Sequence, residues 1–223
     1  MERGIIMKIE INNVWKKIGR TEVLKDINLE FEGGKIYGLR GKNGSGKTML
    51  MRAICGLITV TKGEIIINGK RLGSDMSFPN SIGVLIENPA FIDNFSGYRN
   101  LKALADINHI IGEEEIRNTI KLVGLDPDDK KKFKKYSLGM KQRLGIAAAI
   151  MEKPEIILLD EPINALDEKG VEEIREILFG LRSEERIIIV ACHDREELEA
   201  LSDEIIEIYE GSVISKVKSK VEQ

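Results

Sequence analysis

The spacing of apolar residues differs between segments of the chain, with a period of two in some and a helical period in others. In its first third, apolar residues recur at every second position, as over residues 9–11 and 27–31. A period of two is typical of half-buried β-strands. Short continuous apolar runs at 36–39 and 82–86 predict two more strands, and residues 63–67 predict another that is closed by an Asn-Gly turn signal.

Helical periods begin after a glycine-rich stretch and dominate the middle of the chain. Residues 49–54 predict a short helix that ends before Gly56. Three further helices are predicted, one through the apolar positions 101, 104, 105 and 110, one at 116–123 and one at 137–151. After residue 154 the two kinds of element alternate, with predicted strands at 156–159, 187–191 and 205–209 and predicted helices at 171–181 and 196–201.

The order of these elements predicts an α/β fold. Continuous apolar runs such as 187–190 suit parallel strands that are buried on both faces. Their alternation with helices predicts a sheet that helices cover on both sides. Because the helical middle interrupts this alternation, we predict a core built from residues 1–86 and 151–223, into which residues 87–150 are inserted as a helical subdomain.

Composition narrows the class of protein. Charged residues make up 32% of the 223 residues and the net charge is −3, so the sequence has no overall basic character and nucleic-acid binding is not expected. The longest stretch without a polar side chain, 144–151, is far shorter than the roughly 20 residues of a membrane span, which favours a cytoplasmic protein. Cys55 and Cys192 are too few for a disulfide framework and form no metal pattern. The basic run at 130–135 predicts a solvated surface, with a lipid or nucleic-acid patch as the alternative.

A phosphate-binding loop is predicted between the strand at 36–39 and the helix at 49–54. The pattern G-x-x-x-x-G-K-[ST] is matched by Gly41-Lys42-Asn43-Gly44-Ser45-Gly46-Lys47-Thr48. Its glycines let backbone N–H groups turn toward an anion, and the helix start adds further N–H groups. Lys47 is expected to reach the terminal phosphates of a nucleotide and Thr48 to hold Mg²⁺. The alternative, a plain glycine-rich turn, is disfavoured by the strand before it and the helix after it.

Two acids end the predicted strand at 156–159. Ligands bind at the carboxyl ends of strands in open α/β sheets, which places Asp160 to hold Mg²⁺. Successive residues of a strand point to opposite faces, so Glu161 is free for a different task, the activation of water. A simple cap at the strand end is the alternative.

The spacing of these motifs is specific for one family. Lys47 and Asp160 lie 113 residues apart, and Ser137 begins the stretch Ser137-Leu138-Gly139-Met140-Lys141-Gln142-Arg143 that ends 17 residues before Asp160. Here the chain resembles the ATP-binding subunits of ABC transporters, whose helical insertion ends in a Leu-Ser-Gly-Gly-Gln signature. The resemblance implies a P-loop NTPase core of RecA type with a mixed, largely parallel sheet, an N-terminal antiparallel β part and the helical insertion. It also implies that Ser137 and Gly139 contact the γ-phosphate of an ATP molecule held by a second copy. A capped amphipathic helix is the alternative.

Two further elements extend the resemblance. Asn164-Ala165-Leu166-Asp167 follows Glu161 at the spacing of the D-loop, which crosses the dimer interface in that family. His193 follows the predicted strand at 187–191, as the family's switch histidine does, and a γ-phosphate role is favoured over a structural one. His109 has no such context and receives no role.

Three positions depart from the family pattern. Glu87 stands where the family has the Q-loop glutamine, and we expect it to act in catalysis and toward Mg²⁺, although it cannot donate a hydrogen bond. Ile18 stands where an aromatic residue stacks on adenine, and Trp15 is the alternative base contact. The signature keeps only Ser137 and Gly139 of the family pattern. This altered signature, together with Glu87, resembles the corresponding motifs of the subfamily that exports bacitracin, lantibiotics and related compounds.

The resemblance implies a function and its partners. The chain is expected to bind and hydrolyse ATP with Mg²⁺ between two copies, most simply a homodimer, and to drive export through a separate transmembrane permease. It would then lie on the inner face of the cell membrane, attached through that permease by the apolar patch of Pro89, Phe91 and Phe95. An apolar cluster beneath a loop is the alternative for this patch. Two other functions stay open, a soluble ABC-type ATPase in cofactor assembly and a P-loop kinase for a metabolite.

Overall fold

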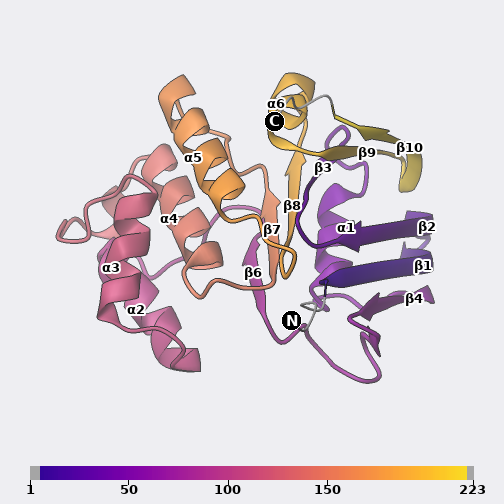
Figure 1. The fold of residues 1–223 in the computed structure, drawn as a ribbon, viewed down its shortest axis with the longest axis horizontal. Coiled ribbons are helices and arrows are strands. Elements are labelled where there is room, and N and C mark those ends of the chain that lie inside the picture. The colour runs from indigo at the N-terminus through magenta and orange to yellow at the C-terminus, as the bar shows by residue number, and fades with distance from the viewer. Residues whose placement is uncertain (1–5, 220–223) are drawn as a thin grey trace, which may run out of the picture.

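The computed structural model describes residues 6–219 and contains two β-sheets (Figure 1). The larger sheet has six strands in the order β10-β9-β3-β8-β7-β6. Its strands from β9 to β6 are parallel, and β10 pairs antiparallel with β9. The bounds are β3 (Ile36–Arg40), β6 (Ile82–Leu85), β7 (Ile156–Asp160), β8 (Ile187–Cys192), β9 (Glu204–Tyr209) and β10 (Ser212–Lys218).

The smaller sheet is antiparallel and is formed mostly by the N-terminal part of the chain. Its order is β2-β1-β4-β5, with β1 (Lys8–Ile18), β2 (Thr21–Glu32), β4 (Lys62–Ile67) and β5 (Lys70–Arg71). The turn between β4 and β5 contains Asn68 and Gly69, both with positive φ. This backbone suits a tight hairpin turn, which explains the turn signal in the sequence.

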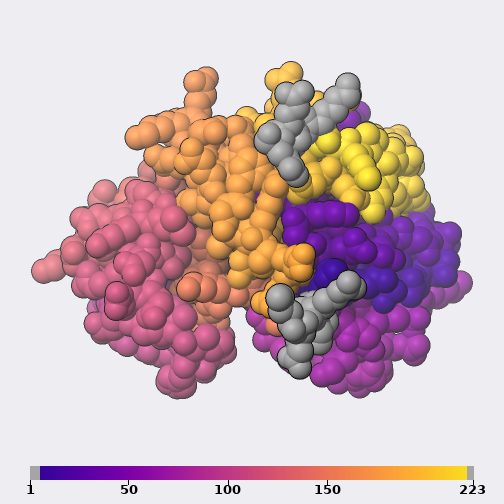
Figure 2. Space-filling model, in the orientation of Figure 1, coloured from indigo at the N-terminus to yellow at the C-terminus, as the bar shows by residue number. Residues whose placement is uncertain are grey.

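The helices lie on both sides of the large sheet (Figure 1). They are α1 (Lys47–Ile54), α2 (Gly97–Asn108), α3 (Glu113–Leu122), α4 (Leu138–Ile150), α5 (Glu168–Gly180) and α6 (Arg195–Leu201), with a 3₁₀ turn at Phe133–Lys135. In both views α2 and α3 form the end of the molecule opposite the antiparallel sheet (Figure 2). The division at residues 86 and 151 stays a prediction. None of the helices in the described part of the chain has both the length and the apolar character that a membrane crossing requires.

Two apolar cores lie on the two faces of the large sheet. Ile157 and Leu159 of β7 face the core shared with α4 and α5, whereas Ile156 and Leu158 face the core shared with α1 and the antiparallel sheet. All five residues of β7 are buried, as are all six of β8. These strands are covered on both sides, so their sequences are continuous apolar runs without the alternation of a half-exposed strand.

The α/β prediction is confirmed, but the helix predicted through Ile110 was too long. Ile110 was placed in a helix with Leu101, but α2 ends at Asn108 and His109 adopts a left-handed backbone with φ 54°. Ile110 therefore lies outside the helix and is exposed. The strands β5 and β10 were not predicted, because two residues are too few for a pattern and β10 mixes lysines with apolar residues.

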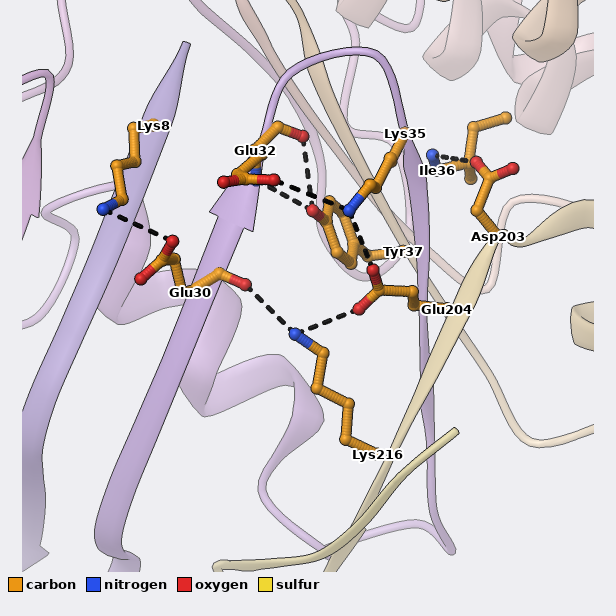
Figure 3. A network of polar contacts seen from close by, with 9 residues as sticks. All are labelled: Lys8, Glu30, Glu32, Lys35, Ile36, Tyr37, Asp203, Glu204 and Lys216. Carbon is orange, nitrogen blue, oxygen red and sulfur yellow. Dashed lines mark hydrogen bonds and ion pairs between the residues drawn. The ribbon is translucent and has the colours of Figure 1, made fainter. Parts of the chain in front are cut away.

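A network of charges joins β9 to its neighbours (Figure 3). The two oxygens of the Glu204 carboxylate lie 3.0 Å from the amines of Lys35 and Lys216. Burial alone would raise the pKa of Glu204, but the two lysines outweigh it and hold the pKa below its ordinary value. Lys216 also donates to the backbone carbonyl of Glu30 in β2, so the network bridges the two sheets.

Candidate nucleotide-binding and hydrolytic site

The loop between β3 and α1 is shaped by its glycines. Gly44 and Gly46 have φ values of 80° and 115°, which residues with a side chain rarely adopt. A Cβ atom on Gly41 would lie 2.4 Å from the carbonyl oxygen of Ile208, so this position has no room for a side chain. No side chain caps α1 at Gly46, which leaves the first N–H groups of the helix free for an anion.

Lys47 is a buried cation without an acidic partner among the described residues. Lys47 is only 5% exposed. Its amine donates to the carbonyl oxygens of Gly41 at 2.6 Å and Lys42 at 3.5 Å. Burying a charge is costly unless an opposite charge compensates it. The loop is therefore electrostatically prepared for an anion such as a phosphate.

Thr48 and Asp160 bring the start of α1 to the end of β7. The hydroxyl of Thr48 donates to the carboxylate of Asp160 at 2.6 Å. Asp160 is 7% exposed, and this burial raises the pKa of its carboxyl. The charge of Glu161 raises this pKa further, while the hydrogen bond from Thr48 and the charge of Lys47 lower it in part. Hydroxyl and carboxylate oxygens are the donors that Mg²⁺ prefers, so the pair fits this metal.

Glu161 is fixed by contacts with β8, with α4 and with the histidine that follows β8. Its backbone has φ 51°, and its N–H donates to the Ala191 carbonyl at 2.8 Å. Its own carbonyl accepts from the side-chain amide of Gln142 at 2.9 Å. One carboxylate oxygen lies 3.0 Å from Nδ1 of His193, while the other is buried without a hydrogen-bond partner. The carboxylate of Glu161 thus keeps an acceptor oxygen that no described donor satisfies.

Cys192 completes the surroundings of Glu161, a neighbour that the sequence did not reveal. Its sulfur, a Glu161 oxygen and a His193 nitrogen lie within 4.8 Å of one another. Burial raises the pKa of the Cys192 thiol to about 12, so it stays protonated at neutral pH. We therefore assign it a packing role.

Residues from distant parts of the chain line one pocket of about 460 Å³. Its walls are Lys42–Met49 from the loop and α1, Asp160 and Glu161 from β7 and its end, and Val23 from β2. A neighbouring hollow of about 630 Å³ adds His193 and Asn164 to Glu161 and the loop. Val23 was not singled out from the sequence, because it carries no motif that could have revealed it, and Asn164 was named only as part of the D-loop.

The signature residues stand apart from this pocket in the same chain. Ser137 caps α4 by accepting the N–H of Met140 at 3.2 Å, and neither Ser137 nor Gly139 lines the pocket. Gly139 packs against the chain near Ala165, whose carbonyl oxygen would be 3.0 Å from an added Cβ. Asp167 caps α5 by accepting the N–H of Gly170 at 3.0 Å. One copy thus presents the loop and the signature cap as separate surfaces.

Three candidate contacts are not assembled at the pocket. Ile18 is 51% exposed at the end of β1, and neither it nor the half-buried Trp15 lines the pocket. Glu87 also lies outside the lining residues, and its carboxylate is paired with Arg52 at 2.6 Å. The roles of these side chains toward base and metal stay predictions.

Comparison with known proteins assigns the family. Residues 24–164 match the family model described as ABC transporter. The chain is 47% identical over 210 residues to the uncharacterized ABC transporter ATP-binding protein YybJ of Bacillus subtilis, covering 94% of this chain and 96% of that one. It is 41% identical to the bacitracin transport ATP-binding protein BcrA of Enterococcus faecalis, over 94% of this chain and 68% of that one.

A solved structure and a further relative agree with this assignment. The chain is 39% identical to the lantibiotic transport ATP-binding protein SrtF of Streptococcus pyogenes, covering 92% of this chain and 89% of that one. The dimeric structure of MJ0796, a bacterial ABC transporter cassette, superposes with a TM-score of 0.85 at 26% identity, over 95% of this chain and 99% of that one. The chain therefore belongs to the ABC transporter family, as an ATP-binding and ATP-hydrolysing subunit.

Proposed function

We propose that two copies of this chain hydrolyse ATP at sites that neither copy can complete alone. The observation that supports this most directly is the separation of the two half-sites. Lys47, Thr48, Asp160 and Glu161 share one pocket, whereas Ser137 and Gly139 lie outside it. In a symmetric pair, the signature cap of each copy would close the pocket of the other.

The charges of the pocket suit the transfer of a phosphoryl group to water. Glu161 would take a proton from a water molecule as the oxygen of that water attacks the γ-phosphorus. The bond between the γ-phosphorus and the oxygen that it shares with the β-phosphate would break, which leaves ADP and phosphate. Lys47 and His193 would lie against the negative charge of the transferring group. Mg²⁺ held by Thr48 and Asp160 would neutralise part of the phosphate charge.

The contribution of Glu161 can be separated from nucleotide binding. Glu161→Gln keeps the shape of the side chain but removes its basicity. We expect this variant to bind ATP, to form a stable ATP-dependent dimer in size-exclusion chromatography and to hydrolyse ATP at least about a hundredfold more slowly. Lys47→Ala is the matched control, because it loses the cation for the phosphates and should form no such dimer. Normal turnover by Glu161→Gln would refute the assignment of the general base.

We further propose that the subunit attaches to a separate permease on the inner face of the membrane. The predicted patch needs refinement, because Phe91 stacks edge-on with Phe133 at 5.1 Å and packs against the core. Its neighbour Ile92 is 51% exposed, while the Asn100 side chain holds the Ile92 backbone by bonds of 2.8 and 3.2 Å. A fixed backbone that displays an apolar side chain suits the docking of another protein.

Substitution of Ile92 tests this attachment without disturbing the core. Ile92→Asp should abolish co-purification with the permease from membranes and leave ATP binding intact. Ile214→Asp is a matched control, since Ile214 is also exposed but lies on β10 at the other end of the large sheet. Equal loss of assembly in both variants, or in neither, would reject this surface.

The transported compound is proposed from the relatives. The proteins named for bacitracin and lantibiotic transport are 41% and 39% identical to this chain over more than nine-tenths of its length. We propose export of a peptide antibiotic of this kind. Cells that carry Lys47→Ala should become more sensitive to such peptides than cells with the unaltered chain, and equal sensitivity to all of them would exclude this substrate class.

A further inference from the structure

Glu87 is held by a cation that the sequence did not single out. Its Oε1 lies 2.6 Å from a guanidinium nitrogen of Arg52 on α1. Within residues 6–219 no second basic side chain forms an ion pair with Glu87. The Glu87 backbone has φ 61°, a left-handed conformation that is uncommon for a residue with a long side chain. The pair joins α1 to the segment that follows β6.

The pair lies beside the residues that fit Mg²⁺. Arg52 follows Thr48 by four residues, so both lie on the same face of α1, one turn apart. β6 and β7 are parallel with Leu85 opposite Leu159, so Glu87 and Asp160 leave the sheet at the same edge. The two carboxylates sense each other, since the charge of Glu87 adds to the effect of burial in raising the pKa of Asp160.

Glu87 therefore has two possible cationic partners, the guanidinium of Arg52 and a metal held by Thr48 and Asp160. When one side chain can contact either of two partners, the population of each contact depends on the relative free energies of the two states. We propose that Arg52 is a positioning residue that draws Glu87 away from the metal–nucleotide site and releases it when the site is loaded. This rests on the proposed function, with its Mg²⁺ at Thr48 and Asp160, and on the prediction from the sequence that Glu87 also acts toward this metal.

Removal of the guanidinium should make Glu87 more available to the metal. The measurement is calorimetric binding of a non-hydrolysable ATP analogue at increasing Mg²⁺ concentration. Arg52→Met should lower the half-effective Mg²⁺ concentration by about two- to fivefold, a modest factor because both side chains are partly exposed and solvent screens the pair. Arg52→Lys should change it less. Arg20→Met is the control, because Arg20 is exposed and forms no ion pair in the described part of the chain.

The Glu87→Gln background separates positioning from other effects of Arg52. There Arg52→Met should cause no further change, because the carboxylate that it positions is gone. Glu87→Gln alone should raise the half-effective Mg²⁺ concentration, since an amide binds the cation more weakly than a carboxylate does.

Three results would overturn the proposal. An equal shift in both backgrounds would mean that Arg52 acts on the nucleotide directly, and no shift in the unaltered background would mean that it does not compete. An unchanged Mg²⁺ dependence in Glu87→Gln would remove Glu87 from the metal. Failure of the unaltered chain to bind the analogue at any Mg²⁺ concentration would instead reject the proposed function itself.

Discussion

The side-chain amide of Gln142 donates a hydrogen bond of 2.9 Å to the backbone carbonyl of Glu161. Gln142 lies on α4, five residues after the cap Ser137, and is almost fully buried. The helix that begins at the signature and the candidate general base are thus tied together within one copy. A displacement of α4 would therefore shift the backbone of Glu161, which already has a positive φ.

Gln142→Leu should slow catalysis more than it weakens binding. The Glu161 carbonyl would keep only the longer bond from the Asn164 N–H at 3.3 Å. A small displacement of a catalytic group lowers rates by about ten- to a hundredfold. We expect kcat to fall by this factor while the KM for ATP changes little, as measured by steady-state kinetics. Lys141→Leu is the control, because the Lys141 amine lies over the Phe133 ring instead. Unchanged kcat in Gln142→Leu would show that this bond does not position Glu161.

Thr48→Val should remove the metal dependence of nucleotide binding. The variant keeps the shape of the side chain but leaves the buried Asp160 carboxylate without its 2.6 Å donor. Because that bond opposes the effect of burial, the pKa of Asp160 should rise further. Binding of ATP without Mg²⁺ should persist through Lys47, while the gain from Mg²⁺ disappears. Thr48→Ser, which retains a hydroxyl, should behave as the unaltered chain, and a full Mg²⁺ gain in Thr48→Val would argue against this metal position.

Gly46→Ala should impair both folding and binding. The residue has φ 115°, and an added Cβ would lie 3.0 Å from the Val23 carbonyl oxygen. Such a backbone with a side chain costs about 1–3 kcal/mol. We expect a lower thermal midpoint and a loss of ATP affinity. Gly180→Ala is the matched control, since a Cβ there meets nothing within 4 Å and the φ is not positive. Wild-type affinity in Gly46→Ala would contradict the account of the loop.

The Glu204 network predicts how stability depends on acid. The folded-state pKa of Glu204 lies below the ordinary value of 4.5, so its stabilisation is fully present above that pH. It is lost as the pH falls through the lower, folded-state pKa. The free energy of unfolding, measured by urea titration, should therefore decrease less steeply below about pH 4.5 in Glu204→Gln than in the unaltered chain. Glu185→Gln, a change at an exposed acid without an ion pair among the described residues, should leave the slope unaltered.

Local motifs predicted the parts of the site that depend on short stretches of chain. The loop from Gly41 to Thr48 needs its glycines for backbone conformation, and β7 needs its apolar run for burial, so both leave a pattern in the sequence. The strand ends at Asp160, and the hydrogen bond from Thr48 brings the two motifs together.

Contacts between distant segments could not be predicted in this way. The pairing of Arg52 with Glu87 and the bond from Gln142 to Glu161 depend on how α1 and α4 pack beside the sheet. Val23 reaches the pocket because β2 passes beside the loop, and no property of valine signals that position. The wrong helix assignment of Ile110 has a similar cause, since an exposed apolar residue past a helix end fits the helical period by coincidence.

The shared site is tested most directly by mixing two inactive variants. Lys47→Ala disables the loop of its own copy, and Ser137→Arg disables the signature cap that its copy would offer to the other. In a mixed pair, one site carries both changes and the other carries neither, so pairs of this kind regain one intact site. With random pairing, an equal mixture should recover about a quarter of the unaltered ATPase rate, although each variant alone is nearly inactive. An equal mixture that stays as inactive as its components, with mixed pairs confirmed by native mass spectrometry, would contradict the two-copy site.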